Sequence, residues 1–245
     1  MTLASKALTI DQLKGVWRRD WLRTKSASDD STRVFWMQSC NSFVDIRIPS
    51  DRPDITQYEC LADLDARTLL QLTQAEGFAG HIELEGDKCT WHREINWHGQ
   101  TDSIDAGKLR LDECGNKLLE DGIHADYKEQ WQRLPEGDCK ALRINNATMR
   151  GFLLLSDSLF ILGIGTVDAP GTAPLINSLQ KGVVPASAQQ LFSSQYCFGH
   201  WDGDEGVAIL STNPFCETKP VLVCGDNTIH WTQYMFDGTQ LSHWF

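Results

Sequence analysis

The stretch Thr90 to Trp97, TWHREINW, carries residues suited to acid–base chemistry on one predicted strand. Read with a period of two, it places His92 and Glu94 on a polar face and three large apolar residues with an arginine on the other. Histidine titrates near neutral pH, and a neighbouring carboxylate fixes its tautomer. His92, Glu94 and Tyr127 are therefore the candidate catalytic residues, and a histidine held by structural hydrogen bonds is the simpler alternative.

Other strands of the first half repeat this mixture of polar and aromatic side chains on one face. Polar groups inside a small barrel must be paired, hydrated or in contact with a ligand, so the pattern predicts either an internal salt-bridge network or a binding cavity. We expect the face from Thr90 to Asn96 to look inward. The alternative places Trp91, Ile95 and Trp97 in the core and His92 in solvent. The predicted ligand-binding residues are Trp36, Gln38, Arg47, His92, Glu94, Tyr127 and Trp131.

Arg18, Arg19 and Arg23 form a short basic stripe. Either an anionic group of a ligand binds there, or the stripe is a solvated strand edge. Because neighbouring residues on a strand face opposite ways, we expect one of Arg18 and Arg19 to point inside.

The sequence has no ligand spacing typical of zinc and no nucleotide-binding or hydrolase motif, so it predicts no metal site and no cofactor.

The composition is that of a globular protein, since 41% of the 245 residues are hydrophobic and 22% are charged. The formal net charge of -11 argues against nucleic acid and against an anionic membrane surface, so the expected partner is a small molecule. No apolar run is long enough to span a bilayer, and the first residues lack the apolar region of a signal peptide. The eight scattered cysteines are expected to be reduced thiols in the cytoplasm. The sequence does not indicate an oligomeric state.

Short β-branched and aromatic stretches separated by turn residues dominate the chain and predict an all-β protein built from two antiparallel barrel halves. One or two short helices are expected, most clearly within residues 61–77, and TIDQLKG, PLINSLQ and SAQQLF are further candidates for single turns or short helices. The segment PEGDC, residues 135 to 139, is the predicted boundary. It divides the chain into an N-terminal barrel, 1–135, and a C-terminal barrel-like half, 136–245.

Gly15-x-Trp17 after a helical turn resembles the opening of the lipocalin-like (calycin) barrels. In that family the first-strand tryptophan closes the barrel floor beneath an arginine of the last strand, which implies that Trp17 packs against Arg133. The first half also resembles an uncharacterised bacterial and fungal family of lipocalin-like architecture, with Asn96 where we would expect an acid. A weaker likeness is to a fungal two-barrel protein that associates with a casein kinase. The blocks that carry the family resemblance are WRRDWL, RVFWMQSCNSFVDIRIPSDRP, GFAG, CTWHREINW and DYKEQWQRL.

Two functions from different classes remain open. The first is an intracellular lipocalin-like protein that binds a small, partly aromatic or amphipathic molecule in a barrel cavity. The second is an enzyme of the same shape, an isomerase, decarboxylase or hydrolase, with His92, Glu94 and Tyr127 as acid–base groups. A protein-interaction scaffold is a weaker alternative. His92 and Tyr127 within hydrogen-bond reach across a cavity would favour catalysis, whereas an aromatic lining without convergent titratable groups would favour binding alone.

Overall fold

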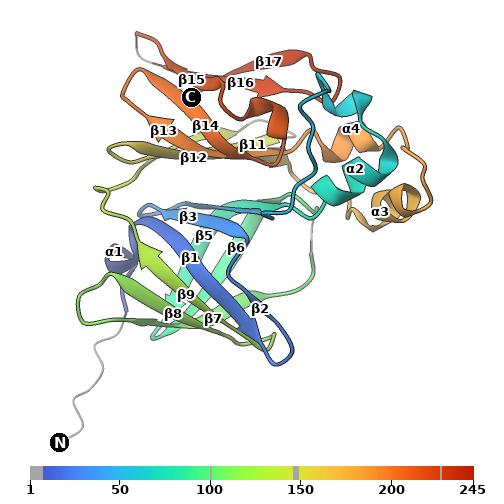
Figure 1. Cartoon of the computed structure of the whole chain (residues 1–245). Coiled ribbons are helices and arrows are strands. Elements are labelled where there is room, and N and C mark those ends of the chain that lie inside the picture. Colours follow the sequence, from blue (N-terminus) through green and yellow to red (C-terminus); the bar gives the residue numbers. More distant parts are fainter. Residues whose placement is uncertain (1–7, 100, 146–148, 227) are drawn as a thin grey trace, which may run out of the picture.

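The computed structural model describes residues 8–99, 101–145, 149–226 and 228–245 and shows two antiparallel sheets packed face to face (Figure 1). The first sheet is closed into a barrel because its first long strand also pairs with its last. Within the described residues its strands are β1 (Gly15–Thr24), β2 (Ser28–Asp29), β3 (Arg33–Gln38), β4 (Phe43–Ile48), β5 (Glu76–Glu85), β6 (Lys88–Asn96), β7 (Asp105–Leu111), β8 (Lys117–Gly122) and β9 (Tyr127–Arg133).

The second sheet runs in strict sequence order and forms a barrel half in which no pairing joins the first and last strands among the described residues. Its strands are β10 (Lys140–Asn145), β11 (Met149–Leu155), β12 (Leu159–Thr166), β13 (Gln195–Trp201), β14 (Glu205–Ser211), β15 (Pro220–Cys224), β16 (Ile229–Tyr234) and β17 (Gln240–Trp244). The helices of the chain are α1 (Ile10–Leu13), η1 (Leu61–Asp63), α2 (Ala66–Leu72), α3 (Ala173–Gln180), α4 (Ala188–Leu191) and η2 (Pro214–Cys216).

The prediction of an all-β protein with two antiparallel barrel halves is confirmed, and the sheets change between Arg133 and Lys140. Separate folding of residues 1–135 and 136–245 stays a prediction. The described residues hold four short α-helices, not one or two, because the segments PLINSLQ and SAQQLF both form helices. The helix α2 is an insertion between β4 and β5, α3 and α4 lie between β12 and β13, and all three gather on one side of the molecule (Figure 1).

The strands β3 and β4 and the first half of β5 are buried on both faces. Alternate side chains such as Trp36 and Phe78 point into the barrel lumen, where they join a cluster with Trp17, Trp91 and Trp131. The residues between them point out of the barrel and pack against the second sheet in one shared apolar cluster. Two buried faces explain why these strands read as nearly continuous apolar runs in the sequence.

Tyr196 of β13 is fully buried in the contact between the sheets. A Cβ atom added to Gly77 of β5 would lie 2.3 Å from Tyr196 Cγ, and one added to Gly163 of β12 would lie 2.7 Å from its Cε1. The ring therefore occupies space that only glycine leaves free on both sheets. Nearby, Phe35 and Phe198 stack with their ring centroids 4.0 Å apart.

Ion pairs between the two halves border this apolar contact. The Arg52 guanidinium lies 2.5 Å from a Glu217 carboxylate oxygen and donates a second hydrogen bond to the Ser211 carbonyl oxygen. On the other border, Arg143 of β10 donates to both carboxylate oxygens of Glu94, at 2.6 Å each. Burial of apolar side chains supplies most of the stabilisation between the two sheets. These polar pairs then fix the lateral position of one sheet relative to the other.

The floor of the first barrel has the arrangement that the lipocalin-like resemblance implies. Trp17 is fully buried, its indole N–H donates to the Leu13 carbonyl oxygen at 2.8 Å, and the Arg133 guanidinium lies 4.1 Å from the ring centroid. Arg133 also donates to the carbonyl oxygens of Gly115, Lys14 and Gln12 and so ties the end of β9 to the α1 turn.

Replacement of Trp17 by alanine should destabilise the protein by about 3–5 kcal/mol, because it empties the barrel floor and removes the ring beneath Arg133. Urea unfolding measures this change. Trp21→Ala in the same strand is the matched control, since Trp21 is only half buried. A Trp17→Ala protein as stable as the Trp21→Ala protein would contradict the role of Trp17 as floor.

Gly77→Ala should lower the free energy of unfolding by about 1–3 kcal/mol, because the new methyl group must displace the Tyr196 ring. Gly171→Ala is the control, since a Cβ at Gly171 meets nothing within 4 Å. Equal unfolding midpoints in urea for the two variants would show that the sheets adjust without loss.

Candidate functional site

Charged side chains pair with one another inside the first barrel. Arg19, whose side chain is 4% exposed, donates to Glu129 at 3.0 Å and also pairs with Asp29 at the barrel mouth. The Arg47 guanidinium bonds to Asp45 at 2.9 Å and lies 3.5 Å from the same Glu129 oxygen. Burial raises the pKa of Asp45 to about 6, although the charge of Arg47 acts to lower it.

A second group in the lumen centres on Glu120 of β8. Tyr127 donates its hydroxyl proton to Glu120 Oε1 at 2.6 Å, and the Trp131 indole N–H donates to Oε2 at 3.2 Å. Burial, followed by the negative charge of Glu129, raises the pKa of Glu120 to about 8, while the hydrogen bond from Tyr127 opposes the rise. The lumen therefore holds a carboxyl group that keeps its proton to a higher pH than an exposed glutamate does.

The lumen is filled by these side chains. The cavity bounded by Trp36, Arg47, Glu120 and Trp131 measures only about 10 Å³, which is near the minimum for a single water molecule. Of the two outcomes that the alternating pattern predicted, the structure shows the internal salt-bridge network.

The other predicted binding residues lie at the two ends of the lumen and around its small central cavity. Gln38 is buried at the floor end of β3, where its amide donates to the carbonyl oxygens of Ser39 and Ser42. Tyr127 is half buried at the start of β9 and contacts Glu120 rather than a histidine. Trp36, Arg47 and Trp131 share the small central cavity. A ligand in the lumen would have to displace these side chains.

The prediction that the face from Thr90 to Asn96 looks into the barrel is wrong for His92 and Glu94. The His92 side chain is 42% exposed, stacks on His81 and lies 3.1 Å from a Glu83 carboxylate oxygen. Glu94 pairs with Arg143 at the border between the two halves. The proposed acid–base group is not assembled, because His92, Glu94 and Tyr127 each contact different partners.

An irregularity in the pairing of β5 and β6 explains the error. The register shifts between Ala79 and Gly80, so Glu94 is an extra residue on β6. On the N-terminal side of Glu94, Trp91 and Arg93 point into the lumen. For Trp91 this agrees with the alternative prediction, which placed it in the core. After it, Ile95 and Trp97 point out of the barrel and join the cluster between the two halves.

The basic stripe divides as the strand geometry predicted. Arg19 lies inside and Arg18 outside, where Arg18 contacts Asp20 at 3.3 Å. Arg23 stacks over Trp21. Arg18 also borders a polar groove of about 380 Å³ between the outer barrel wall and β14. Two aspartates, Asp20 and Asp30, line the same groove, so its charge is mixed.

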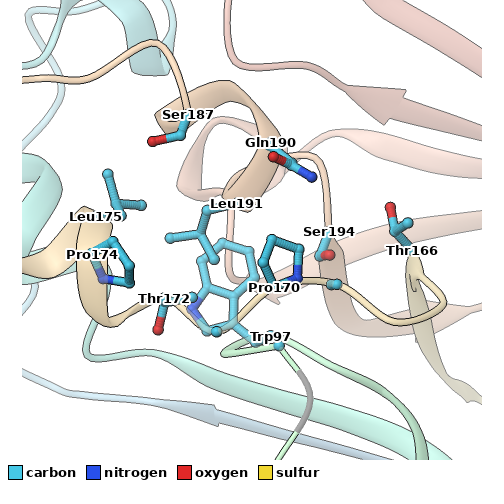
Figure 2. A pocket seen from close by; sticks show the side chains of 13 residues that line it. Trp97, Thr166, Pro170, Thr172, Pro174, Leu175, Ser187, Gln190, Leu191 and Ser194 are labelled. Atoms are coloured by element: carbon cyan, nitrogen blue, oxygen red, sulfur yellow. The ribbon is translucent and has the colours of Figure 1, made fainter.

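A largely apolar pocket of about 210 Å³ lies where the loop after β6 meets the α3–α4 segment of the second half. We call it the junction pocket. Figure 2 shows the Trp97 indole among the side chains that line it, together with Leu191 and Pro170. The described residues that line it are Trp97, Gly99, Thr166, Ala169, Pro170, Gly171, Thr172, Pro174, Leu175, Ser187, Gln190, Leu191 and Ser194.

His98 fixes the geometry of the junction pocket from behind. Its Nε2 lies 3.0 Å from the Ala75 carbonyl oxygen and therefore carries the proton, which leaves Nδ1 to accept from the Thr172 hydroxyl at 3.1 Å. The backbone N–H of Thr172 donates to the His98 carbonyl oxygen at 3.2 Å. One imidazole thus joins the end of α2, the loop after β6 and the start of α3.

The sequence indicates Trp97 as a large apolar residue of the TWHREINW stretch but does not point to the other lining residues. Most of them come from the stretch between β12 and β13, where the sequence predicts only the short helices PLINSLQ and SAQQLF. Its length was the available signal, because connections beyond about 12–15 residues in a compact sheet protein are uncommon and are often functional.

Comparison of the chain with protein families, with curated proteins and with solved structures found no match. No helix of the described residues is long and apolar enough to cross a membrane. Within the same residues, no group of three or more His, Cys, Asp or Glu side chains is arranged to hold a metal ion. The candidate site therefore depends on geometry alone.

Replacement of Glu120 by glutamine should change how stability depends on pH. The folded pKa of about 8 lies above the ordinary value of 4.5, so the native state holds more protons than the unfolded chain between these values and loses stability as pH rises through them. Glu120→Gln removes this decline, by at most about 1.4 kcal/mol per pH unit, and stabilises the protein relative to wild type at pH 8.

Urea unfolding at a series of pH values measures this slope, and Glu113→Gln on the exposed turn before β8 is the control. The same slope in the Glu120→Gln and Glu113→Gln proteins would mean that Glu120 ionises in the folded state as easily as in water.

Proposed function

We propose that this protein binds a small, largely apolar molecule in the junction pocket. The observation that carries the proposal is a pocket of about 210 Å³ with a largely apolar wall that includes the buried Trp97, in a protein whose barrel lumen has only about 10 Å³ free. The lipocalin-like barrel would then support a site on its outer wall, not in its lumen.

The size of the pocket limits the ligand. Sites for drug-sized molecules measure roughly 300–1,000 Å³, so the junction pocket is smaller than these. An apolar cavity of about 150 Å³ binds benzene. A pocket of about 210 Å³ therefore suits a molecule of one or two rings, or a short branched chain of similar volume.

Binding without catalysis is favoured by the lining. The described lining residues include no His, Asp, Glu, Lys, Arg, Cys or Tyr, so no titratable side chain faces a bound molecule. His98 lies behind the wall with both ring nitrogens occupied. The enzyme alternative with His92, Glu94 and Tyr127 loses support because these residues are apart.

The relation to the lipocalin-like family and a cytoplasmic location belong to the same proposal. The Trp17–Arg133 floor and the closure of β1 on β9 support the relation. The cysteine thiols, all of which are free in this structure, support a reducing compartment.

Single-ring and double-ring aromatic compounds should shift the NMR signal of the Trp97 indole N–H, and Ala169→Phe should abolish the shift because the new ring fills the pocket. Ala125→Phe on an exposed barrel loop is the control. Native mass spectrometry of freshly purified protein should show a bound small molecule in wild type and in Ala125→Phe but not in Ala169→Phe. Compounds that shift the signal equally in Ala169→Phe would place the binding elsewhere.

A further inference from the structure

The second sheet ends in a strand with one open edge. On one side β17 pairs with β16, and on the other side no described strand pairs with it. Gln240, Ser242 and Trp244 of this strand are all exposed to solvent. The open edge is therefore accessible along the length of the strand.

The pairing with β16 decides which backbone groups of β17 are free. Ile229 and Phe245 exchange both backbone hydrogen bonds, at 3.2 and 2.9 Å, and the Met235 N–H donates to the Thr239 carbonyl oxygen at 2.8 Å. Bonded and non-bonded pairs alternate in an antiparallel ladder, and the register between these two ends is regular. The even-numbered residues of β17 therefore direct their N–H and C=O groups away from β16, along the open edge.

The sequence of β17 does not protect this edge. Proteins keep edge strands from pairing with other chains by means of Lys, Pro, a bulge or a covering segment. The strand reads QLSHW, without Pro, Asp, Glu, Lys or Arg, and its pairing with β16 has no bulge. At the opposite end of the same sheet, β10 carries Lys140 and Arg143, and Arg143 is held by Glu94 of the barrel. The two edges of the sheet thus differ, and β17 is the one suited to accept a further strand.

The distribution of charge favours a second copy of the chain at this edge. Two copies with a formal net charge of -11 each repel one another over most of their surfaces. In residues 229–244, which form the β16–β17 hairpin, Asp237 of the turn is the sole Asp, Glu, Lys or Arg residue. A contact made through β17 therefore brings two acidic molecules together where they carry the least charge.

The strand is also complementary to itself. Antiparallel pairing about a twofold axis at Ser242 places Trp244 of each copy opposite Gln240 of the other, so no two bulky side chains meet. Trp244 is 62% exposed in the single chain and packs beside His230, with the ring centroids 4.5 Å apart. The second copy would cover this ring, and every residue with a free N–H and C=O would face another such residue.

We propose that β17 pairs with β17 of a second copy of this chain, antiparallel about a twofold axis at Ser242. The second sheets of the two copies then join into one continuous sheet, in an interface that uses the same surface on both molecules. The inference does not depend on the junction pocket, since none of the described residues that line that pocket belongs to β16 or β17.

Sedimentation equilibrium of the full chain over a range of protein concentrations tests the proposal, and wild type should dimerise. Ser242→Pro removes the N–H that faces the second copy and leaves the hydrogen bonds to β16 in place. It should weaken the dimer about tenfold or more, because each copy loses a hydrogen bond. Ser242→Lys should also weaken the dimer, since it places two positive charges opposite each other at the axis. Ser242→Thr keeps the N–H and the hydroxyl, and as the matched control it should dimerise like wild type.

Amide hydrogen exchange gives a readout that needs no variant. The amides of Ser242 and Trp244 should exchange more slowly at high protein concentration than at low concentration. Those of Leu241 and His243, which donate to β16, should be protected at both concentrations. This measurement and Ser242→Lys decide the question if Ser242→Pro lowers the urea midpoint of the protein.

A wild-type protein that is monomeric at every concentration would overturn the proposal and leave the edge to an extended segment of a different protein. A dimer as stable in Ser242→Lys as in Ser242→Thr would overturn it as well. So would exchange of the Ser242 and Trp244 amides that does not depend on protein concentration, because the two copies would then meet elsewhere.

Discussion

The contact between the outer wall of the barrel and the second sheet is the constraint on which the rest of the structure depends. Tyr196 occupies space that Gly77 and Gly163 leave free, and around it the outward side chains of β3 to β6 share one cluster with the second sheet. Without the second sheet, that wall would expose a large apolar patch to water. The contact also holds the loop after β6 against α3, and so it determines the position of Trp97 and the shape of the junction pocket.

The lumen of the barrel and the junction pocket differ in how their space is filled. In the lumen, Arg19, Arg47, Asp45 and Glu129 satisfy one another and leave almost no free volume. Such a network specifies the internal geometry of the barrel, because each charge is stable only beside its partner. The larger free volume lies outside the barrel, where the loop after β6 meets the segment that carries α3 and α4. In the proposed function, the barrel supplies one wall of the site.

The sequence predicted the fold well because period-two alternation, turn residues and the Gly15-x-Trp17 opening are local signals. Trp36, Arg47 and Trp131, which the sequence predicted as ligand-binding residues, do lie together in the lumen, and their role in binding stays a prediction. It failed at β6, because the extra residue Glu94 reverses the faces of the strand and a bulge leaves no clear mark in a single sequence. The junction pocket could not be predicted, since its wall combines segments more than 60 residues apart, Trp97 and the residues from Thr166 onward. Only the packing of the two sheets brings them together.

The order of strands has a consequence for synthesis on the ribosome. Neighbours in each sheet are neighbours along the chain, apart from the pairings of β1 with β3 and with β9, so most pairing can form as the chain emerges. The barrel can close once β9 is complete, but Tyr196 and the rest of β13 are made more than 60 residues later. Until β13 is made, the outward apolar side chains of the first sheet lack the Tyr196 contact and part of their cover, a state prone to aggregation. If the first half folds on its own, a nascent chain of this protein is most in need of chaperone protection after that step, not before.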